Sequence, residues 1–565
     1  MRSTLALTAA LLWVSCFAPM AAAGDDEFHD TAWLDELLTP WRDPEGPGLI
    51  VAASQNGQVL FKRSYGLANL EYRVPNTAAT RFNAGSITKV LTAHTLLKLE
   101  QDGLLELDDA LGSYLADLPS ELGRVTLRQL LQHTAGVKDD WTLASLAGWE
   151  TSDVRSHEQA RRLINRQDGL NFAAGSAFSY SNSGYILLAD VIEAVTGRTY
   201  ADWVAAEVLQ PLGMEATILP TSPMQVVDGL ATPYEMRRAG SGDPRQTHLV
   251  RGNVQSNVQG AGNLVTNAAD LLRLGEHLID ARLGESSMLD RMQEQAQLSE
   301  GIPSGYGLGL QVGKLGDSLM LHHGGSLSGY RSHLLLLPEA GLVVAVLGNV
   351  NNIRPAAVGT EIALRLLDPE PVAEVKEPDT QTQPLRHAAL EESARYRGRY
   401  MLETGRMLTV EAAEGRLYMR LGGSLKALLP ESENRFVLAG EETPVRFEGG
   451  SNGRMARLVL ELPEHRLEAK RIDSKPISGW EARQYSGRYY SAALDVHYEL
   501  SVIDDRLLAR RSRGDDLKFQ AIGDDRFLEW EPGDLLLTFE RNRRGRVNGF
   551  SLSANRARDI AFVRE

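Results

Sequence analysis

The sequence predicts an α+β protein: an antiparallel sheet with a helical lobe, followed by two small antiparallel β-barrel-like modules. Within residues 24–368, strand-like runs lie at both ends and mostly helical runs lie between them. A Pro-, Glu- and Thr-rich stretch without periodicity at 369–390 is typical of a linker. The rest of the chain carries an internal repeat. With 565 residues, the chain exceeds what one core can bury, so several domains are expected.

Residues 1–23 are typical of an export signal. Arg2 supplies the positive region, an apolar core runs from 5 to 14, and Ala21-Ala22-Ala23 forms a small-residue cleavage site. We therefore expect an exported protein, periplasmic or secreted, with an uncleaved anchor as the alternative. Cys16 is the only cysteine, so the cleaved chain would contain no disulfide.

The sheet is expected to begin with a hairpin, because Asn56-Gly57 separates two apolar runs at 48–54 and 58–65. A second hairpin is expected where Pro338-Glu-Ala-Gly341 separates two later runs. Later strands are predicted at 306–312, 318–323, 331–337 and 342–347, and helices at 29–39, 127–132, 158–165, 185–196, 268–279 and 355–367.

The two C-terminal modules are predicted from the repeat. Tyr396-Arg-Gly-Arg-Tyr400 recurs 89 residues later as Tyr485-Ser-Gly-Arg-Tyr489, and the segments that follow are strand-like runs separated by Gly, Asn and Asp. We assign module 1 to 391–476 and module 2 to 479–565, each as a small antiparallel barrel.

A buried helix is predicted to begin within Phe82-Asn-Ala-Gly-Ser-Ile-Thr-Lys89 and to run to about Gly103, because its residues from Ile87 on are apolar around most of the helix. Ser86 lies at its start and Lys89 three residues later, on the same face. A buried lysine beside a serine can be neutral and accept its proton. The tetrad alone is weak evidence, since an N-cap serine with a lysine reaching solvent is the commoner origin of these residues at this spacing.

Two further polar segments interrupt apolar runs. Tyr180-Ser181-Asn182 precedes the apolar stretch at 186–195, where a helix N-cap is the structural alternative. His323-Gly324-Gly325 ends a strand-like run, where the glycines allow close backbone approach and a β-bulge is the alternative.

The order Ser86-x-x-Lys89, Tyr180-Ser181-Asn182, His323-Gly324-Gly325 resembles the serine β-lactamase-like hydrolases. That superfamily includes class C β-lactamases, penicillin-binding DD-peptidases, related esterases and D-aminopeptidases. The resemblance covers about 30–368, and its flanking landmarks are Leu131–Gly136, Pro211–Met214, Gly262–Asp270 and Tyr306–Leu310.

The resemblance implies that Ser86 attacks a carbonyl and forms an acyl-enzyme. Lys89 and Tyr180 are both candidates for the base, and the sequence leaves that choice open. The oxyanion would lie between the backbone N–H groups of Ser86 and Ser326, and Asn182 would orient the substrate amide. No metal or cofactor is implied.

His323 departs from the β-lactamase pattern, which has Lys-Thr-Gly where this chain has His-Gly-Gly. In the family that lysine helps to hold a substrate carboxylate, and a neutral imidazole would do so poorly at pH 7. Penicillin hydrolysis is therefore disfavoured, and ester or peptide substrates without that carboxylate are favoured. His322-His323-Gly324 also fits His-x-Gly, but the position of the following Gly-Gly-Ser favours His323.

The predicted function is an exported serine hydrolase acting on a small molecule or short peptide, most simply a D-aminopeptidase-like peptidase. In that group, which also has two C-terminal β domains, those domains narrow the mouth of the site. A carboxylesterase and a non-catalytic penicillin-recognition or sensor protein are the alternatives, and the modules could instead be carbohydrate- or partner-binding appendages. An α/β-hydrolase is disfavoured because Gly-x-Ser-x-Gly is absent.

Charge and hydropathy narrow the partners. The formal net charge of −15 at pH 7 argues against nucleic acid and against an anionic membrane surface. No stretch after the signal is long and apolar enough to span a bilayer. The sequence leaves the oligomeric state undetermined.

Overall fold

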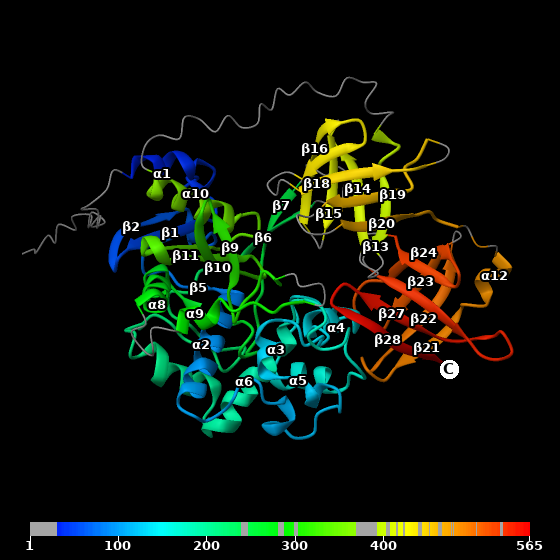
Figure 1. Cartoon of the computed structure of the whole chain (residues 1–565), viewed down its shortest axis with the longest axis horizontal. Coiled ribbons are helices and arrows are strands. Elements are labelled where there is room, and N and C mark those ends of the chain that lie inside the picture. Colours follow the sequence, from blue (N-terminus) through cyan, green and yellow to red (C-terminus); the bar gives the residue numbers. More distant parts are fainter. Residues whose placement is uncertain are drawn as a thin grey trace, which may run out of the picture.

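The computed structural model describes residues 31–238, 247–280, 288–298, 303–368 and 393–565, the last range with gaps of one to four residues. The expected signal at 1–23 and the expected linker at 369–390 lie outside the described residues. A sheet-and-helix domain occupies one half of Figure 1, and two β-barrels occupy the other half. The predicted α+β class is confirmed.

The sheet of the sheet-and-helix domain is antiparallel and has six strands in the order β2-β1-β12-β11-β10-β9, so the first and last segments of that domain lie side by side. Asn56 and Gly57, with φ of +50° and +79°, form the turn of the first hairpin, as expected for Asn-Gly. The bounds are Leu49–Gln55 (β1), Gln58–Tyr65 (β2), Gln311–Leu315 (β9), Ser318–Leu327 (β10), Tyr330–Leu337 (β11) and Leu342–Gly348 (β12).

Both faces of this sheet are covered, and this explains why its central strands are continuously apolar. In β12, Val343, Ala345 and Leu347 belong to the core shared with helices α2 (Thr88–Gln101) and α8 (Ala268–Asp280). Val344 and Val346 instead pack under α1 (Ala32–Leu37) and α10 (Pro355–Leu367).

The helical lobe is inserted between β2 and β9. Its helices, with those that cover the sheet, are Ala32–Leu37 (α1), Thr88–Gln101 (α2), Leu127–Leu131 (α3), Asp140–Leu146 (α4), His157–Asn165 (α5), Asn182–Thr196 (α6), Tyr200–Val204 (α7), Ala268–Asp280 (α8), Met288–Met292 (α9) and Pro355–Leu367 (α10). Short strand pairs join Leu67–Asn69 (β3) to Val74–Pro75 (β4), Phe82–Asn83 (β5) to Val265–Thr266 (β8), and Tyr234–Arg238 (β6) to Thr247–Arg251 (β7). None of the described helices has the length and apolar character needed to cross a membrane.

The strand expected at 306–312 was placed wrongly. β9 begins only at Gln311, because Gly305 and Gly309 have φ of +72° and +80° and turn the chain between them. Gly309 lies against α2, where a Cβ would come within 2.9 Å of the Lys89 carbonyl oxygen. This segment therefore packs against α2 instead of extending the sheet.

Each C-terminal module is a closed antiparallel barrel of eight strands. The repeated tyrosines have the same role in both, since Tyr400 Oη donates to the Tyr396 carbonyl at 2.7 Å and Tyr489 Oη to the Tyr485 carbonyl at 2.9 Å. Strand bounds are Gly398–Leu402 (β13), Met407–Ala413 (β14), Arg416–Leu421 (β15), Ser424–Ser432 (β16), Arg435–Leu438 (β17), Thr443–Glu448 (β18), Arg457–Glu461 (β19), Arg466–Ile472 (β20), Gly487–Ser491 (β21), Val496–Ile503 (β22), Arg506–Arg511 (β23), Leu517–Gly523 (β24), Arg526–Glu529 (β25), Leu536–Arg541 (β26), Val547–Ala554 (β27) and Ala557–Arg564 (β28), with helix α12 (Gly479–Arg483) before β21.

The second barrel is attached to the sheet-and-helix domain through α4. Leu143, Leu146 and Ala147 belong to the same apolar cluster as the barrel interior. Tyr498 Oη donates to the Leu146 carbonyl at 2.6 Å. Because α4 begins beside the site described below, this attachment places the β27–β28 turn at the same site.

Candidate active site

Ser86 lies in a short 3-10 turn, η2 (Gly85–Ile87), directly before α2. Gly85 has a φ of +52°, and its N–H donates to Asn83 Oδ1 at 2.9 Å, so the chain turns sharply into the helix. Lys89 follows one turn later, and its Nζ donates to Ser86 Oγ at 3.1 Å. The three-residue spacing therefore places the two side chains in direct contact.

Lys89 is completely buried, and its Nζ also donates to Asn182 Oδ1 at 2.8 Å and to the Ala261 carbonyl at 2.6 Å. Burial lowers the pKa of Lys89 to about 7, although the carboxylates of Asp139 and Asp140 act in the opposite direction. At neutral pH the amine is thus divided between its charged and neutral forms. The neutral form can accept the Ser86 proton.

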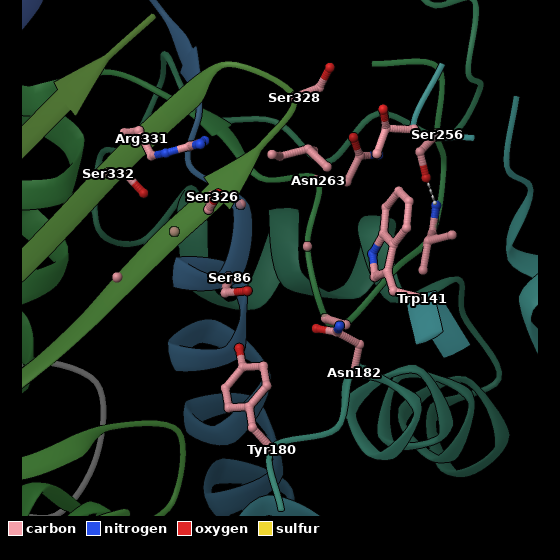
Figure 2. A pocket seen from close by; sticks show the side chains of 18 of the residues that line it. Ser86, Trp141, Tyr180, Asn182, Ser256, Asn263, Ser326, Ser328, Arg331 and Ser332 are labelled. Carbon is pink, nitrogen blue, oxygen red and sulfur yellow. Dashed lines mark hydrogen bonds between the residues drawn. The ribbon is translucent and has the colours of Figure 1, made fainter. Parts of the chain in front are cut away.

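The Tyr180 hydroxyl points toward the Ser86 side chain (Figure 2), and an interaction with the Ser86 hydroxyl favours the ionised form of the phenol. Lys89 Nζ lies 4.9 Å from the centroid of the tyrosine ring. Burial raises the pKa of Tyr180 well above its ordinary value, and the Ser86 interaction and Arg556 offset this only in part. Tyr180 is therefore a phenol at neutral pH, able to donate a proton.

Asn182 is oriented by hydrogen bonds to Asp139, a residue that the sequence analysis did not identify. The backbone N–H and the Nδ2 of Asn182 donate to Asp139 Oδ2 at 2.9 Å and 3.0 Å. Its Oδ1 faces Lys89, so the amide orientation is determined by both ends. The second Nδ2 hydrogen remains for the cavity that Asn182 lines.

His323 faces the interior side of β10 and does not line the cavity, unlike Gly324, Gly325 and Ser326. Its Nδ1 donates to the Gly324 carbonyl at 2.7 Å, and its Nε2 accepts from Tyr306 Oη at 2.9 Å. Burial lowers the pKa of His323 to about 3. These two hydrogen bonds occupy both ring nitrogens of His323, so neither nitrogen is available to a substrate. His322 points to the opposite face, where it contacts His333 at 3.3 Å.

Ser326 lies on an open stretch of strand edge. β9 pairs with β10 only from Ser318 to His322, and the turn between Leu327 and Tyr330 has two residues. The two residues that flank such a turn form a hydrogen-bonded pair, and hydrogen-bonded and non-hydrogen-bonded pairs alternate along an antiparallel ladder. The next pair, Ser326 and Arg331, is therefore not hydrogen-bonded. The Ser326 N–H therefore points away from β11, toward η2, where a Cβ on Gly85 would come within 3.0 Å of that nitrogen.

The cavity in front of Ser86 has a volume of about 980 Å³, and it is lined by residues of the sheet-and-helix domain and of the second barrel. Ser86, Tyr180, Asn182 and the edge of β10 form its floor and walls, and Asn555 and Arg556 of the β27–β28 turn close one side. The Arg556 guanidinium lies 5.8 Å from the Tyr180 ring centroid and 3.8 Å from Asp139 Oδ1. Its carbonyl accepts the Asp139 N–H at 2.9 Å.

The sequence analysis missed Asp139 and Arg556, and it named Tyr306 only as the start of the landmark at 306–310, without a role at the site. Asp139 follows the landmark at 131–136 closely, and that proximity was the only available signal. Arg556 carried none, because its role depends on where the second barrel docks.

The beta-lactamase family model matches residues 34–367, which is more than half of the chain. The chain belongs to the beta-lactamase family. The match spans the sheet, the helical lobe and Ser86, Lys89 and Tyr180. Together with the relatives described next, it identifies the chain as a serine hydrolase.

Similar proteins extend over the barrels as well. A D-aminopeptidase of Brucella anthropi is 27% identical, over 92% of this chain and 96% of that protein. A D-aminopeptidase of Gluconobacter oxydans (strain 621H) is 29% identical, over 93% and 97%. Among solved structures, the octameric penicillin-binding protein homologue from Pyrococcus abyssi matches with a TM-score of 0.55 at 23% identity, over 78% of this chain and 100% of that one, which supports the fold. The crystal structure of SurE matches with a TM-score of 0.50 at 27% identity, over 78% and 98%.

Proposed function

We propose that this beta-lactamase family hydrolase is a D-aminopeptidase-like peptidase that works through an acyl-enzyme on Ser86. The observation that carries the proposal is the contact of Ser86 with both a half-neutral lysine and a protonated tyrosine, in a cavity closed on one side by the second barrel. The D-aminopeptidases similar over the whole chain, barrels included, support the substrate class.

In the proposed reaction, neutral Lys89 accepts the Ser86 proton as Oγ attacks the carbonyl carbon. The N–H groups of Ser86 and Ser326 stabilise the oxyanion. The proton then reaches the leaving nitrogen by way of the Tyr180 hydroxyl, and water hydrolyses the ester. This assigns the base, which the sequence left open between Lys89 and Tyr180, to Lys89.

The direct test compares D-alanine p-nitroanilide, its L-isomer and a p-nitrophenyl ester, with Ser86→Ala as the blank. We expect cleavage of the D-anilide that is lost in the variant. Ester cleavage alone would instead favour a carboxylesterase with the barrels as accessories. No turnover above the blank would favour a penicillin-recognition or sensor protein.

A pH profile tests the assignment of the base. Because the neutral form of Lys89 is required, kcat/KM should rise with pH and reach half of its plateau near pH 7. The raised pKa of Tyr180 predicts that the plateau does not fall up to pH 10. The measurement uses p-nitrophenyl acetate, which has no amine of its own to titrate. A profile that falls between pH 6 and 8 would rule out neutral Lys89 as the base.

Replacing Arg556 by glutamine should move that midpoint above pH 7. The guanidinium lowers the pKa of Lys89, and its removal also leaves the opposing Asp139 carboxylate less screened. Arg558→Gln is the matched control, because Arg558 follows the same turn but does not line the cavity. An unchanged midpoint in Arg556→Gln would mean that the barrel turn does not influence the base.

We also propose export to the periplasm or the medium, on the basis of the signal-like residues 1–23. N-terminal sequencing of the protein recovered from the periplasmic fraction should show a chain that begins at Gly24. A chain that retains Met1 in that fraction would favour the uncleaved anchor.

A further inference from the structure

Arg331 is a cation on the cavity wall that has no carboxylate within ion-pair distance among the described residues. The other two arginines that line the cavity each form an ion pair: Arg155 lies 2.5 Å from Asp140, and Arg556 lies 3.8 Å from Asp139. Arg331 instead donates from Nη1 to the carbonyl of its neighbour Tyr330 at 2.7 Å.

Glu235, an acidic residue of the cavity lining, interacts with Arg331 electrostatically but does not form an ion pair with it. Glu235 favours its charged form, but the Glu235 carboxylate accepts from Ser328 Oγ at 3.1 Å and from Arg237 at 2.9 Å. Burial lowers the pKa of Arg331, which opposes its charge. The desolvation cost of a partly buried guanidinium is not fully offset when no anion is paired with it. The planar N–H donors of a guanidinium match the two oxygens of a carboxylate.

The position of Arg331 indicates which part of a substrate its guanidinium would contact. Arg331 is paired in register with Ser326, the proposed oxyanion donor. In Figure 2, Asn182 and Trp141 lie on one side of Ser86, and Arg331 lies on the other. A substrate whose acyl part contacts Asn182 therefore extends its leaving group toward Arg331.

We propose that Arg331 binds a carboxylate on the leaving amine, so that the substrate is a short peptide with a free C-terminal carboxylate, a dipeptide foremost. This inference rests on the proposed peptidase function and names its substrate class. It reverses the expectation, drawn from His323, that the site lacks a group for a carboxylate. The cation is supplied from the neighbouring strand β11 rather than from the His-Gly-Gly segment.

The test compares D-alanylglycine with D-alanylglycinamide, which differ only in the terminal carboxylate. The wild type should prefer the acid by about tenfold or more in kcat/KM, as expected for a charge-assisted hydrogen bond. Arg331→Gln should lower kcat/KM for the acid by roughly 10- to 100-fold, mainly through KM, and change the amide less than about twofold. Arg331→Lys should retain part of the preference.

Arg354→Gln removes an exposed charge just before the lining residue Pro355, so it is the matched control and should leave both rates unchanged.

The acid-to-amide ratio is measured within each variant, so it does not depend on how much of the protein is folded. A wild type that treats both compounds alike, or an Arg331→Gln variant that lowers both rates in parallel, would overturn the carboxylate site. Failure to cleave either compound, beside intact esterase activity, would overturn the peptidase proposal itself and this inference with it.

Discussion

Replacing Lys89 by methionine is expected to lower kcat/KM by roughly 10³- to 10⁴-fold, the upper range for loss of a general base. Methionine has nearly the length of lysine but cannot accept a proton, and it cannot donate to Ser86 Oγ, Asn182 Oδ1 and the Ala261 carbonyl. The measurement is the steady-state rate on the best substrate, with the melting temperature recorded beside it.

Lys98→Met is the matched control, because Lys98 lies on the same helix but near the surface, 3.2 Å from Asp102. Its rate should equal that of the wild type. If Lys89→Met retained more than a tenth of the wild-type rate, Lys89 could not be the base. Tyr180 would then become the candidate.

Replacing Gly325 by alanine is expected to have the second-largest effect. A Cβ there would come within 2.0 Å of the Ala84 carbonyl oxygen and 2.2 Å of Ser332 Oγ, so β10 must move away from η2. That movement displaces the Ser326 N–H from the oxyanion position. Loss of one such donor costs roughly 10²- to 10³-fold in kcat, and overpacking of this kind costs about 1–3 kcal/mol of stability.

Gly324→Ala is the control for Gly325→Ala, one residue away on the same strand. There the nearest atom to a Cβ is the Ser332 carbonyl oxygen at 3.7 Å, which is ordinary contact. We expect near wild-type kcat and melting temperature in Gly324→Ala. If Gly325→Ala were as active as Gly324→Ala, the close approach of β10 to η2 would not be needed for catalysis.

Local patterns in the sequence were sufficient for the architecture. Asn56-Gly57 predicted a hairpin because that dipeptide readily adopts the required positive φ. The repeat at Tyr396 and Tyr485 predicted two similar barrels, and the structure confirms two barrels and shows that each has eight strands in the same order. The strand expected at 306–312 failed, because its apolar alternation does not reveal that two glycines turn the chain.

The sequence by itself determined the pairing of Ser86 with Lys89, since three residues along a helix bring two side chains together regardless of what surrounds them. Only the tertiary structure decided how that pair is tuned. The pKa of Lys89 depends on complete burial, and the orientation of Asn182 depends on Asp139. The approach of Arg556 depends on the docking of α4 into the second barrel. Such contacts join segments far apart in the chain, and local periodicity carries no information about them because it records only which face of an element is buried.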